Sequence, residues 1–394
     1  MKAHSSCQSL LQSSRHSFNP IRNLTPERLS QVLDAFHNGH LAPAAKLWES
    51  IERRDDVLQG VISKRKNATS RLRWEILTLD NSPEALSQKA ALEYFYNHLS
   101  CTNACDPNEH GGLALLIKQM MDAIGKQYAI HEIVLQPTNP YPSATFQFVP
   151  LWYFERKNGQ LHFLSSPESP SLPIQKGSWL VTKGEGLMES SSIAYLFKHL
   201  PLRDWLIYCE RNGMPGVKGS THAMPGTAEW EAAKAAVADF SAEFHALVSD
   251  GTQIEAIDLS SRGTLPYPQL VDRMDRALIA LWRGSDLSTL SKKNATGASL
   301  QDDEAAILEA HDSALISETL NFQVDRVLIQ QLFQSPHPKA YFHLLPQNHS
   351  SKLYELEVCQ KLHALGFPLS QSDLSERFGF APSQKSSQTL PPSP

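Results

Sequence analysis

The chain has 394 residues, which is too long for one compact core and predicts two or three structural units. With 41% hydrophobic and 20% charged residues it has the composition of a folded protein, and its net charge of −5 argues against a basic nucleic-acid-binding protein. No apolar run approaches the roughly 18 residues of a membrane span, and the N-terminus lacks the apolar segment of a secretory signal. Five irregularly spaced cysteines are typical of a reducing compartment rather than of a disulfide scaffold.

The N-terminal part of the chain predicts helices. Residues 1–18 are rich in Ser and Gln and are expected to be disordered. The sequence TPE at 25–27 is a helix start, and residues 82–131 are interpreted as further helix that begins at a similar SPE sequence. Between these two regions, one helix is expected to carry four apolar residues: Leu47, Ile51, Val57 and Ile62.

A basic cluster lies in this helical part, with KRK at 64–66 and RLRW at 71–74. The favoured interpretation is a solvated helix face, and the alternative is a contact with another subunit or with nucleic acid. The acidic pair next to two arginines at 53–56 (RRDD) is interpreted as a surface ion cluster.

Between residues 133 and 182 the pattern changes to short strands rich in aromatic and β-branched residues. Asn158-Gly159 is a hairpin turn signal, and the Ser- and Pro-rich stretch at 165–173 is expected to be a loop. The predicted strands are 144–149, 151–154, 160–163 and 178–182.

Two helices farther along the chain share an apolar character beyond a single stripe. The first, 190–212, ends before Gly213, and Pro201 inside it predicts a kink or a break. The second, 268–283, is followed by a glycine. About half of their large aromatic residues are expected in the core and the others on a subunit interface: Tyr195, Trp205, Tyr208 and Trp282.

A compact α/β insert is predicted between these two helices, at 214–260. Its helix is expected to span 227–248, with Thr227 as the N-cap and one continuous apolar stripe. A short strand is predicted at 254–259.

The last part of the chain begins with a polar loop at 285–297. A long helix is predicted from 300 to 333, about 50 Å at 1.5 Å per residue. A strand candidate at 341–345 and a helix at 353–365 follow. Residues spaced seven apart predict a packing seam along the long helix: Leu308, Leu315, Phe322 and Ile329.

The sequence shows no catalytic motif of the nucleophile-elbow, Walker, dinucleotide or zinc-protease type. The best metal candidates are Cys101, Cys105 and His110, but zinc needs four ligands and no fourth is apparent. The pair Asp302-Asp303 is explained by a helix first turn, where the dipole favours acidic residues. The sequence therefore favours a protein that is not an enzyme and needs no cofactor.

Several stretches of the chain share a pattern with one family, and the most specific is LFKHLPLRDWL at 196–206, which runs into ERNGMP at 210–215. The others are NPIRNLTPERL at 19–29, LAP at 41–43, IERRD at 51–55, residues 58–66, LRWE at 72–75, DAIGKQYAIHE at 122–132 and residues 264–283. Together, over roughly 19–345, they resemble the portal proteins of Mu-like phages and prophages. The segment 99–112 has no counterpart in that family, and GSD at 284–286 departs from its frequent Gly-Gln-Thr sequence.

The resemblance implies an α+β, mainly helical fold of the phage portal type, with a wing, stem helices, an α/β clip and an inner helical crown region. It implies the following division of the chain: a disordered N-terminus (1–18), wing (19–189), stem helix 1 (190–213), clip (214–262), stem helix 2 (263–284), channel loop (285–298), long helix with the return to wing and crown (299–345), C-terminal helical segment (346–382) and disordered tail (383–394).

The resemblance also implies a function. Such subunits form a ring, usually of twelve copies, at one capsid vertex, through which double-stranded DNA is packaged and later ejected. The implied partners are other copies of the chain, the packaging motor (terminase), and capsid and head-completion proteins. The implied location is the virion, and the host cytoplasm during assembly. A metal-binding enzyme around Cys101, Cys105 and His110 and a monomeric adaptor or scaffold protein are the alternatives.

Candidate contact residues follow from the same division of the chain. Twelve copies at −5 each would carry about −60, which largely repels DNA and lets it slide, whereas a strongly basic channel would hold it. The few cations expected to touch phosphates are Lys292, Lys293 and Arg283. The exposed side of the clip helix is expected to dock the motor through Glu229, Lys234, Asp239 and Glu243.

Overall fold

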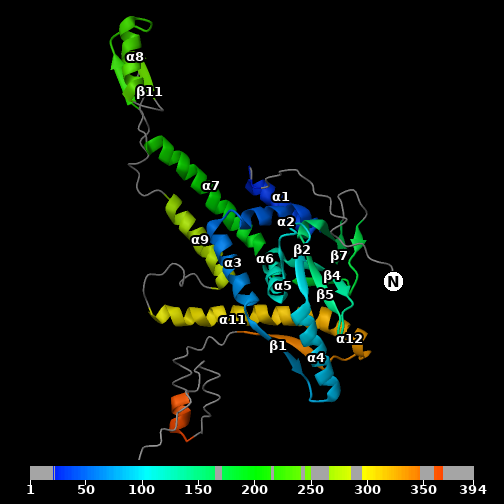
Figure 1. The fold of residues 1–394 in the computed structure, drawn as a ribbon. Helices are drawn as coiled ribbons and strands as arrows, with labels where there is room; N and C mark the ends of the chain where they lie inside the picture. Colours follow the sequence, from blue (N-terminus) through cyan, green and yellow to red (C-terminus); the bar gives the residue numbers. More distant parts are fainter. Residues whose placement is uncertain are drawn as a thin grey trace, which may run out of the picture. The chain divides into compact units, whose positions relative to one another are not determined.

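The computed structural model describes residues 21, 23–164, 171–213, 217–240, 245–249, 266–284, 295–346 and 359–366 (Figure 1). The side chains of 211–213, 217–220, 236–240, 245–249 and 295–303 are not described. The chain divides into two compact units, Met1–Pro346 and Gln347–Pro394, and in the second unit residues 359–364 are helical. The predicted strand at 254–259 and the segments 1–18 and 383–394 lie outside the described residues.

Helices form the N-terminal part, as expected: α1 (Pro26–His37), α2 (Leu41–Glu52), α3 (Asp56–Ser70) and α4 (Pro83–His98). The predicted caps are confirmed, since the side chains of Thr25 and Ser82 accept hydrogen bonds from Arg28 N and Ala85 N. The single helix expected over residues 47–62 is wrong. Two helices occupy this stretch because Asp55 caps α3, with its carboxylate accepting from Leu58 N at 2.8 Å.

A five-stranded sheet forms the centre of the first unit. Its strand order is β3-β2-β5-β4-β9, with β2 and β5 parallel and the other pairs antiparallel. Residues 82–131, predicted as helix, in fact hold strands as well as α5 (Leu113–Met120) and α6 (Asp122–Lys126). The five strands of the sheet are β2 (Ser100–Asn103), β3 (His110–Gly111), β4 (Tyr128–Gln136), β5 (Ser143–Val149) and β9 (Trp179–Lys183).

A smaller three-stranded sheet stands beside it: β6 (Phe154–Lys157), β7 (Gln160–Phe163) and β8 (Leu172–Pro173). The predicted hairpin turn joins β6 and β7, and Asn158 and Gly159 have φ angles of 51° and 77°. Positive φ at both positions is what a type I′ turn requires. The strand predicted at 151–154 is wrong, because Leu151–Tyr153 form a 3₁₀ turn that follows Pro150.

The two apolar helices and the α/β insert are present. They are α7 (Met188–Gly213) and α9 (Tyr267–Arg283), and between them β10 (Val217–Thr221) pairs in parallel with β11 (His245–Ser249) next to α8 (Ala228–Phe240). The helix predicted at 227–248 is too long, because α8 ends at Phe240 and residues 245–249 form β11. Pro201 does not break α7, which continues through it.

The long helix of the C-terminal part is interrupted by a π-helical turn. It consists of α11 (Ala295–Leu320), the turn η4 (Asn321–Asp325) and α12 (Arg326–Phe333). The predicted seam fails at Phe322, whose side chain is 63% exposed, because it lies two residues, or about 200° of helix rotation, beyond the buried Leu320. Ile316, Leu320, Val324 and Leu328 are buried instead.

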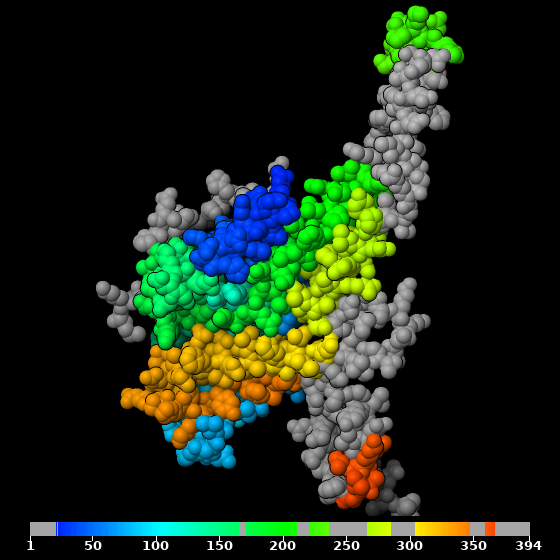
Figure 2. Space-filling view, turned by 180° about the vertical axis from the view of Figure 1, so that it is seen from behind, coloured from blue at the N-terminus to red at the C-terminus, as the bar shows by residue number. Residues whose placement is uncertain are grey.

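Strand β12 (Ala340–Leu345) returns to the N-terminal part and pairs antiparallel with β1 (Arg73–Thr78), a strand that the sequence pattern did not indicate. Figure 2 shows α11, α12 and β12 as one continuous yellow-to-orange band. Through β12, this band therefore connects residues 295–345 with β1.

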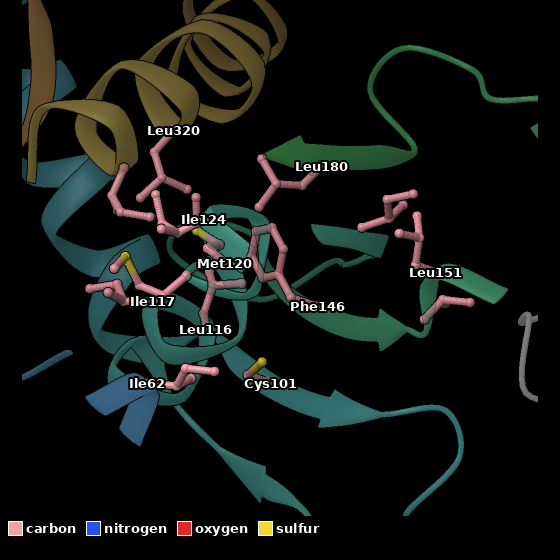
Figure 3. Packing of buried hydrophobic residues seen from close by; sticks show 14 of the residues in the cluster. Ile62, Cys101, Leu116, Ile117, Met120, Ile124, Phe146, Leu151, Leu180 and Leu320 are labelled. Atoms are coloured by element: carbon pink, nitrogen blue, oxygen red, sulfur yellow. The ribbon is translucent and has the colours of Figure 1, made fainter. Parts of the chain in front are cut away.

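The core lies between α5, the main sheet and α11 (Figure 3). Leu116 and Met120 of α5 and Leu320 of α11 lie among Phe146 and Leu180 of the sheet, and all five side chains are buried. Burying side chains of this size contributes about 1.5–3 kcal/mol each. The core therefore depends on residues from both halves of the chain.

The π-helical turn holds the sheet through the half-buried Gln323 and the β1–β12 ribbon through the buried Asp325. Gln323 donates from Nε2 to Val181 O at 2.7 Å and accepts from Val181 N at 2.9 Å. The carboxylate of Asp325 accepts from Tyr96 Oη at 2.5 Å and from Phe342 N at 2.8 Å. Burial raises the pKa of Asp325 to about 7, against the opposing effect of these two hydrogen bonds.

The raised pKa of Asp325 predicts a pH-dependent stability. Because the fold favours the protonated carboxyl, its contribution is complete below about pH 4, the ordinary range of Asp, and is lost as the pH rises through about 7. Asp325→Asn keeps one acceptor and one donor but cannot ionise. We expect the stability of wild type relative to this variant, measured by urea unfolding, to fall by a few kcal/mol between pH 4 and 8.

The exposed Asp34, changed to Asn, is the matched control and should leave the pH profile as in wild type. Parallel pH profiles for wild type and Asp325→Asn would contradict the assignment of this titration to Asp325.

Candidate functional site

The helices α7 and α9 pack side by side and run antiparallel (Figures 1 and 2). Two contacts fix their register: Trp282 Nε1 donates to Ser191 Oγ at 2.9 Å, and Lys198 Nζ lies 2.6 Å from Asp275 Oδ1. Seven residues separate the two contacts on each helix. Their regular spacing indicates that the pair acts as one rigid element over this length.

Lys198 attaches this helix pair to α3. Its ammonium group is nearly buried and lies 3.0 Å from Asp55 Oδ2 and 3.1 Å from Asp56 Oδ1, in addition to Asp275. Burial alone would lower the pKa of Lys198, but the hydrogen bond to Asp275 and the charge of Asp55 raise it instead. The group therefore stays charged, and it joins α3, α7 and α9.

Arg65 makes the second attachment, at the other end of α3. Its Nε and Nη2 atoms donate to Asp312 Oδ2 and Oδ1 at 2.8 and 2.9 Å, and its Nη1 donates to Trp282 O at 3.2 Å. The exposed fractions of the Arg65 and Asp312 side chains are 8% and 1%. A bidentate pair this deeply buried fixes α11 and the end of α9 on α3.

A third buried group surrounds Lys66 of α3. Lys66 Nζ lies 2.9 Å from Glu52 Oε1 and 2.8 Å from Asp122 Oδ1, and Lys126 Nζ lies 3.0 Å from Asp122 Oδ2. Lys126 also pairs with Glu49. Burial opposes ionisation of Asp122, but the two lysines hold the pKa of its carboxyl well below the usual range. These charges line a cavity of about 850 Å³ whose walls therefore carry mutually paired groups.

Both interpretations of the basic cluster are wrong for its central residues. Arg65 and Lys66 neither face solvent nor contact a partner, because both are paired inside the chain. Lys64 is exposed, as a solvated face requires. Asp55 is also not part of a surface cluster, since it is 1% exposed and caps α3. A usable signal was present, because single charges such as Lys198 and Asp312 stand on otherwise apolar helix faces.

The metal candidates do not form a ligand set. Cys101 is buried and donates to Gln119 Oε1 at 2.9 Å, and burial raises the pKa of its thiol to about 12. Cys105 donates to Tyr153 Oη, and His110 Nδ1 lies 3.0 Å from Asn108 O on an exposed strand. Within the part of the chain that the structure describes, no three His, Cys, Asp or Glu side chains are grouped to hold a metal.

The residues proposed for contacts divide between described and undescribed parts. Arg283 is the last residue of α9 and is half-buried, whereas Lys292 and Lys293 lie outside the described residues. Glu229 and Lys234 are exposed on α8. Asp239 lies in the same helix, but its side chain is not described, and Glu243 lies outside the described residues.

The N-cap of α8 is as predicted. Thr227 Oγ1 accepts from Trp230 N at 3.2 Å. Of the four aromatic residues of α7 and α9, Tyr195 and Trp282 are buried within the chain, as expected for half of them. Trp205 and Tyr208 are half-buried, and their place on a subunit interface stays a prediction. In the described residues, no helix is long and apolar enough to cross a bilayer.

Comparison with known proteins identifies the family. The family model described as "Portal protein of Mu bacteriophage" matches residues 45–380, most of the chain. The chain belongs to this family. Its membership agrees with the portal fold expected from the sequence and with a structural rather than enzymatic role for this portal protein. No curated protein sequence matches the chain.

Solved structures with a similar fold come from gene transfer agent (GTA) particles. A chain of the virion of a native GTA particle aligns with a TM-score of 0.52 at 14% identity, covering 90% of this portal chain and 100% of its own. A chain from the neck of an empty GTA particle, computed with C6 symmetry, gives 0.52 at 13% identity, covering 88% and 100%. One from the neck of a native particle, computed with C12 symmetry, gives 0.51 at 12%, covering 90% and 94%.

The buried pair of Arg65 and Asp312 predicts a large effect of mutation on the stability of the portal protein. Arg65→Ala leaves a buried carboxylate without its partner, so we expect a loss of about 3–5 kcal/mol in the free energy of unfolding, measured with urea. Lys64→Ala, one residue earlier and exposed, should change it by less than about 0.5 kcal/mol.

Replacing both partners tests the same pair differently. Because Arg65→Met with Asp312→Leu removes both charges, the double variant should lose far less stability than Arg65→Ala. Equal losses for Arg65→Ala and Lys64→Ala would show that the pair does not hold the helices.

Proposed function

We propose that the chain is the subunit of a portal ring through which double-stranded DNA passes during packaging and ejection. The observation that carries this proposal is the match of residues 45–380 to the Mu portal family. The order of elements supports it, because two long antiparallel helices flank a small βαβ module. The similar structures from particle necks, one computed with C12 symmetry, favour a ring of twelve.

In this proposal the described elements take the roles of a portal subunit. Residues 19–189 form the wing, α7 and α9 the stem, and the β10–α8–β11 module the clip. The channel loop, predicted at 285–298, is limited to 285–294 because α11 begins at Ala295, and α11 leads the inner section. The stem is then attached to the wing through α3, by the charges of Lys198 and Arg65.

The channel surface of this ring carries little positive charge. Twelve subunits at −5 each would carry about −60, so the ring largely repels phosphates, and Lys292, Lys293 and Arg283 provide transient contacts. The packaging motor supplies the ATP hydrolysis and docks on α8 at the exposed Glu229 and Lys234 and at Asp239, and on Glu243 beyond the helix. The assembled ring resides in the virion with capsid and head-completion proteins, after assembly in the host cytoplasm.

The first test is the solution mass of the purified chain, measured by light scattering with negative-stain images of the same fraction. We expect rings of about twelve protomers with a central hole, because a closed head-to-tail interface repeats in every subunit. A chain that stays monomeric, also in the presence of the scaffold and capsid proteins of the same genome, would contradict the proposal.

The second test concerns the channel cations. Changing Lys292 and Lys293 together to Ala removes two positive charges per subunit, so we expect rings of normal mass that package or retain less DNA. Packaged DNA is measured as nuclease-resistant DNA per particle. The same change at Lys46 and Lys64, two exposed lysines of the wing helices, is the matched control. Equal DNA content in both double variants would remove the assignment.

A further inference from the structure

The helix α7 carries an exposed apolar stripe, formed by Ile193, Phe197 and Ile207. Their side chains are 41%, 51% and 39% exposed. Phe197 lies four residues after Ile193, which is close to one full turn. Ile207 lies fourteen residues after Ile193, which is close to four full turns, so the three lie on one face of the helix. The half-buried Pro201 lies between them on that face.

This stripe faces away from α9. The residues of α7 that contact α9 include Ser191 and Lys198, and the buried Tyr195 lies between them. Helix geometry places these three on the side opposite Ile193. The helix α1 reaches the stripe side at the first turn of α7, where His37 Nε2 lies 3.1 Å from Glu189 Oε1. The stripe begins one turn beyond this contact.

The outward face of α9 has the opposite character. Its exposed residues include Ala277 and Ala280, which leave room for large side chains, and Arg273, which carries a positive charge. Arg276 lies on the same face and pairs with Asp272. A surface of small residues with basic neighbours is complementary to large apolar side chains next to an acid, and α7 provides such an acid in the exposed Asp204.

The internal register of the two helices sets the heights of these residues. Ser191 lies level with Trp282 and Lys198 with Asp275, so Ile193 lies level with Ala280 and Phe197 one residue from Ala277. Asp204 lies about one turn from Arg273, within reach of a long side chain. A rotation about an axis along the helices leaves every height unchanged. In a ring whose axis runs along α7 and α9, the stripe of one subunit therefore lies at the same level as the small residues of the next subunit.

We propose that the α7 stripe of one subunit packs against the outward face of α9 in the next subunit. Phe197 lies over Ala277 and Ala280 of that neighbour, and Asp204 faces its Arg273. The proposal rests on the ring of the proposed function and names two different surfaces, as a head-to-tail interface requires. A second copy is the occupant that matches in three respects: size, charge and height.

The first experiment places a charge in the stripe. In Phe197→Asp a carboxylate would be buried between subunits, so we expect at least a tenfold smaller ring fraction by light scattering and negative stain, with an unchanged circular dichroism spectrum of the subunit. Leu206→Asp is the matched control, because Leu206 is 65% exposed on the same helix and lies nine residues, or two and a half turns, from Phe197. Its rings should form as in wild type.

The second experiment tests the register by charge reversal. Asp204→Arg and Arg273→Asp should each reduce the ring fraction, because each places like charges opposite one another, and the double variant should restore it. Asp204 also lies 3.4 Å from its neighbour Arg203, an exposed contact that is unchanged in Arg273→Asp. Recovery in the double variant therefore reports the contact between subunits.

The third experiment reads the partner directly. A photoreactive benzoylphenylalanine at position 197, in rings mixed from ¹⁴N- and ¹⁵N-labelled chains, should give mixed-isotope cross-links to the peptide that contains Ala277 and Ala280. If the Phe197→Asp variant forms as many rings as wild type, or if the cross-links reach any other protein or peptide, this interface is overturned and the ring proposal stays intact. A wild-type chain that never forms rings would overturn both.

Discussion

The structure depends on charges that α3 buries at both of its ends. The buried Asp55 at its start holds Lys198, and Arg65 and Lys66 near its end hold carboxylates from α11 and α6. Each of these charges would cost several kcal/mol if it were buried alone, and each is offset only when the partner element is in place. Folding of the first unit is therefore coupled to the correct docking of the surrounding helices, and α3 is the element that they share.

This arrangement makes the attachment of α7 and α9 geometrically exact. The helix pair α7–α9 meets the rest of its unit at ion pairs with fixed geometry, including the bidentate contact of Arg65 with Asp312. Apolar packing alone tolerates sliding by small steps, whereas a bidentate pair loses both hydrogen bonds when it shifts. Because these charges hold the helix pair in place, the outer faces of α7 and α9 are not needed to stabilise the fold. One face can therefore be apolar and the other small and basic without destabilising the subunit.

Local signals in the sequence predicted much of this fold, and the long-range ones were out of reach. Caps at Thr25 and Ser82 and the turn at Asn158-Gly159 depend on residues within a few positions, and they are confirmed. Strand β4 was missed because it lies between two other strands of the sheet. Such a central strand has no alternation of apolar and polar residues that would distinguish it from a buried helix. The pair of Arg65 and Asp312 joins residues 247 positions apart, and only the tertiary structure shows that the basic cluster is internal.

Gln323 limits the pairing of β9 with strands of other chains. Strand β9 is the last strand of its sheet, and its outer edge offers backbone groups that another chain could pair with. The side-chain amide of Gln323 satisfies both the N–H and the C=O of Val181 there, in the manner of a strand that is one residue long. The contact therefore blocks pairing of another chain with the edge of β9 at Val181. Subunits then associate through other surfaces, those whose repeated contact gives a closed assembly.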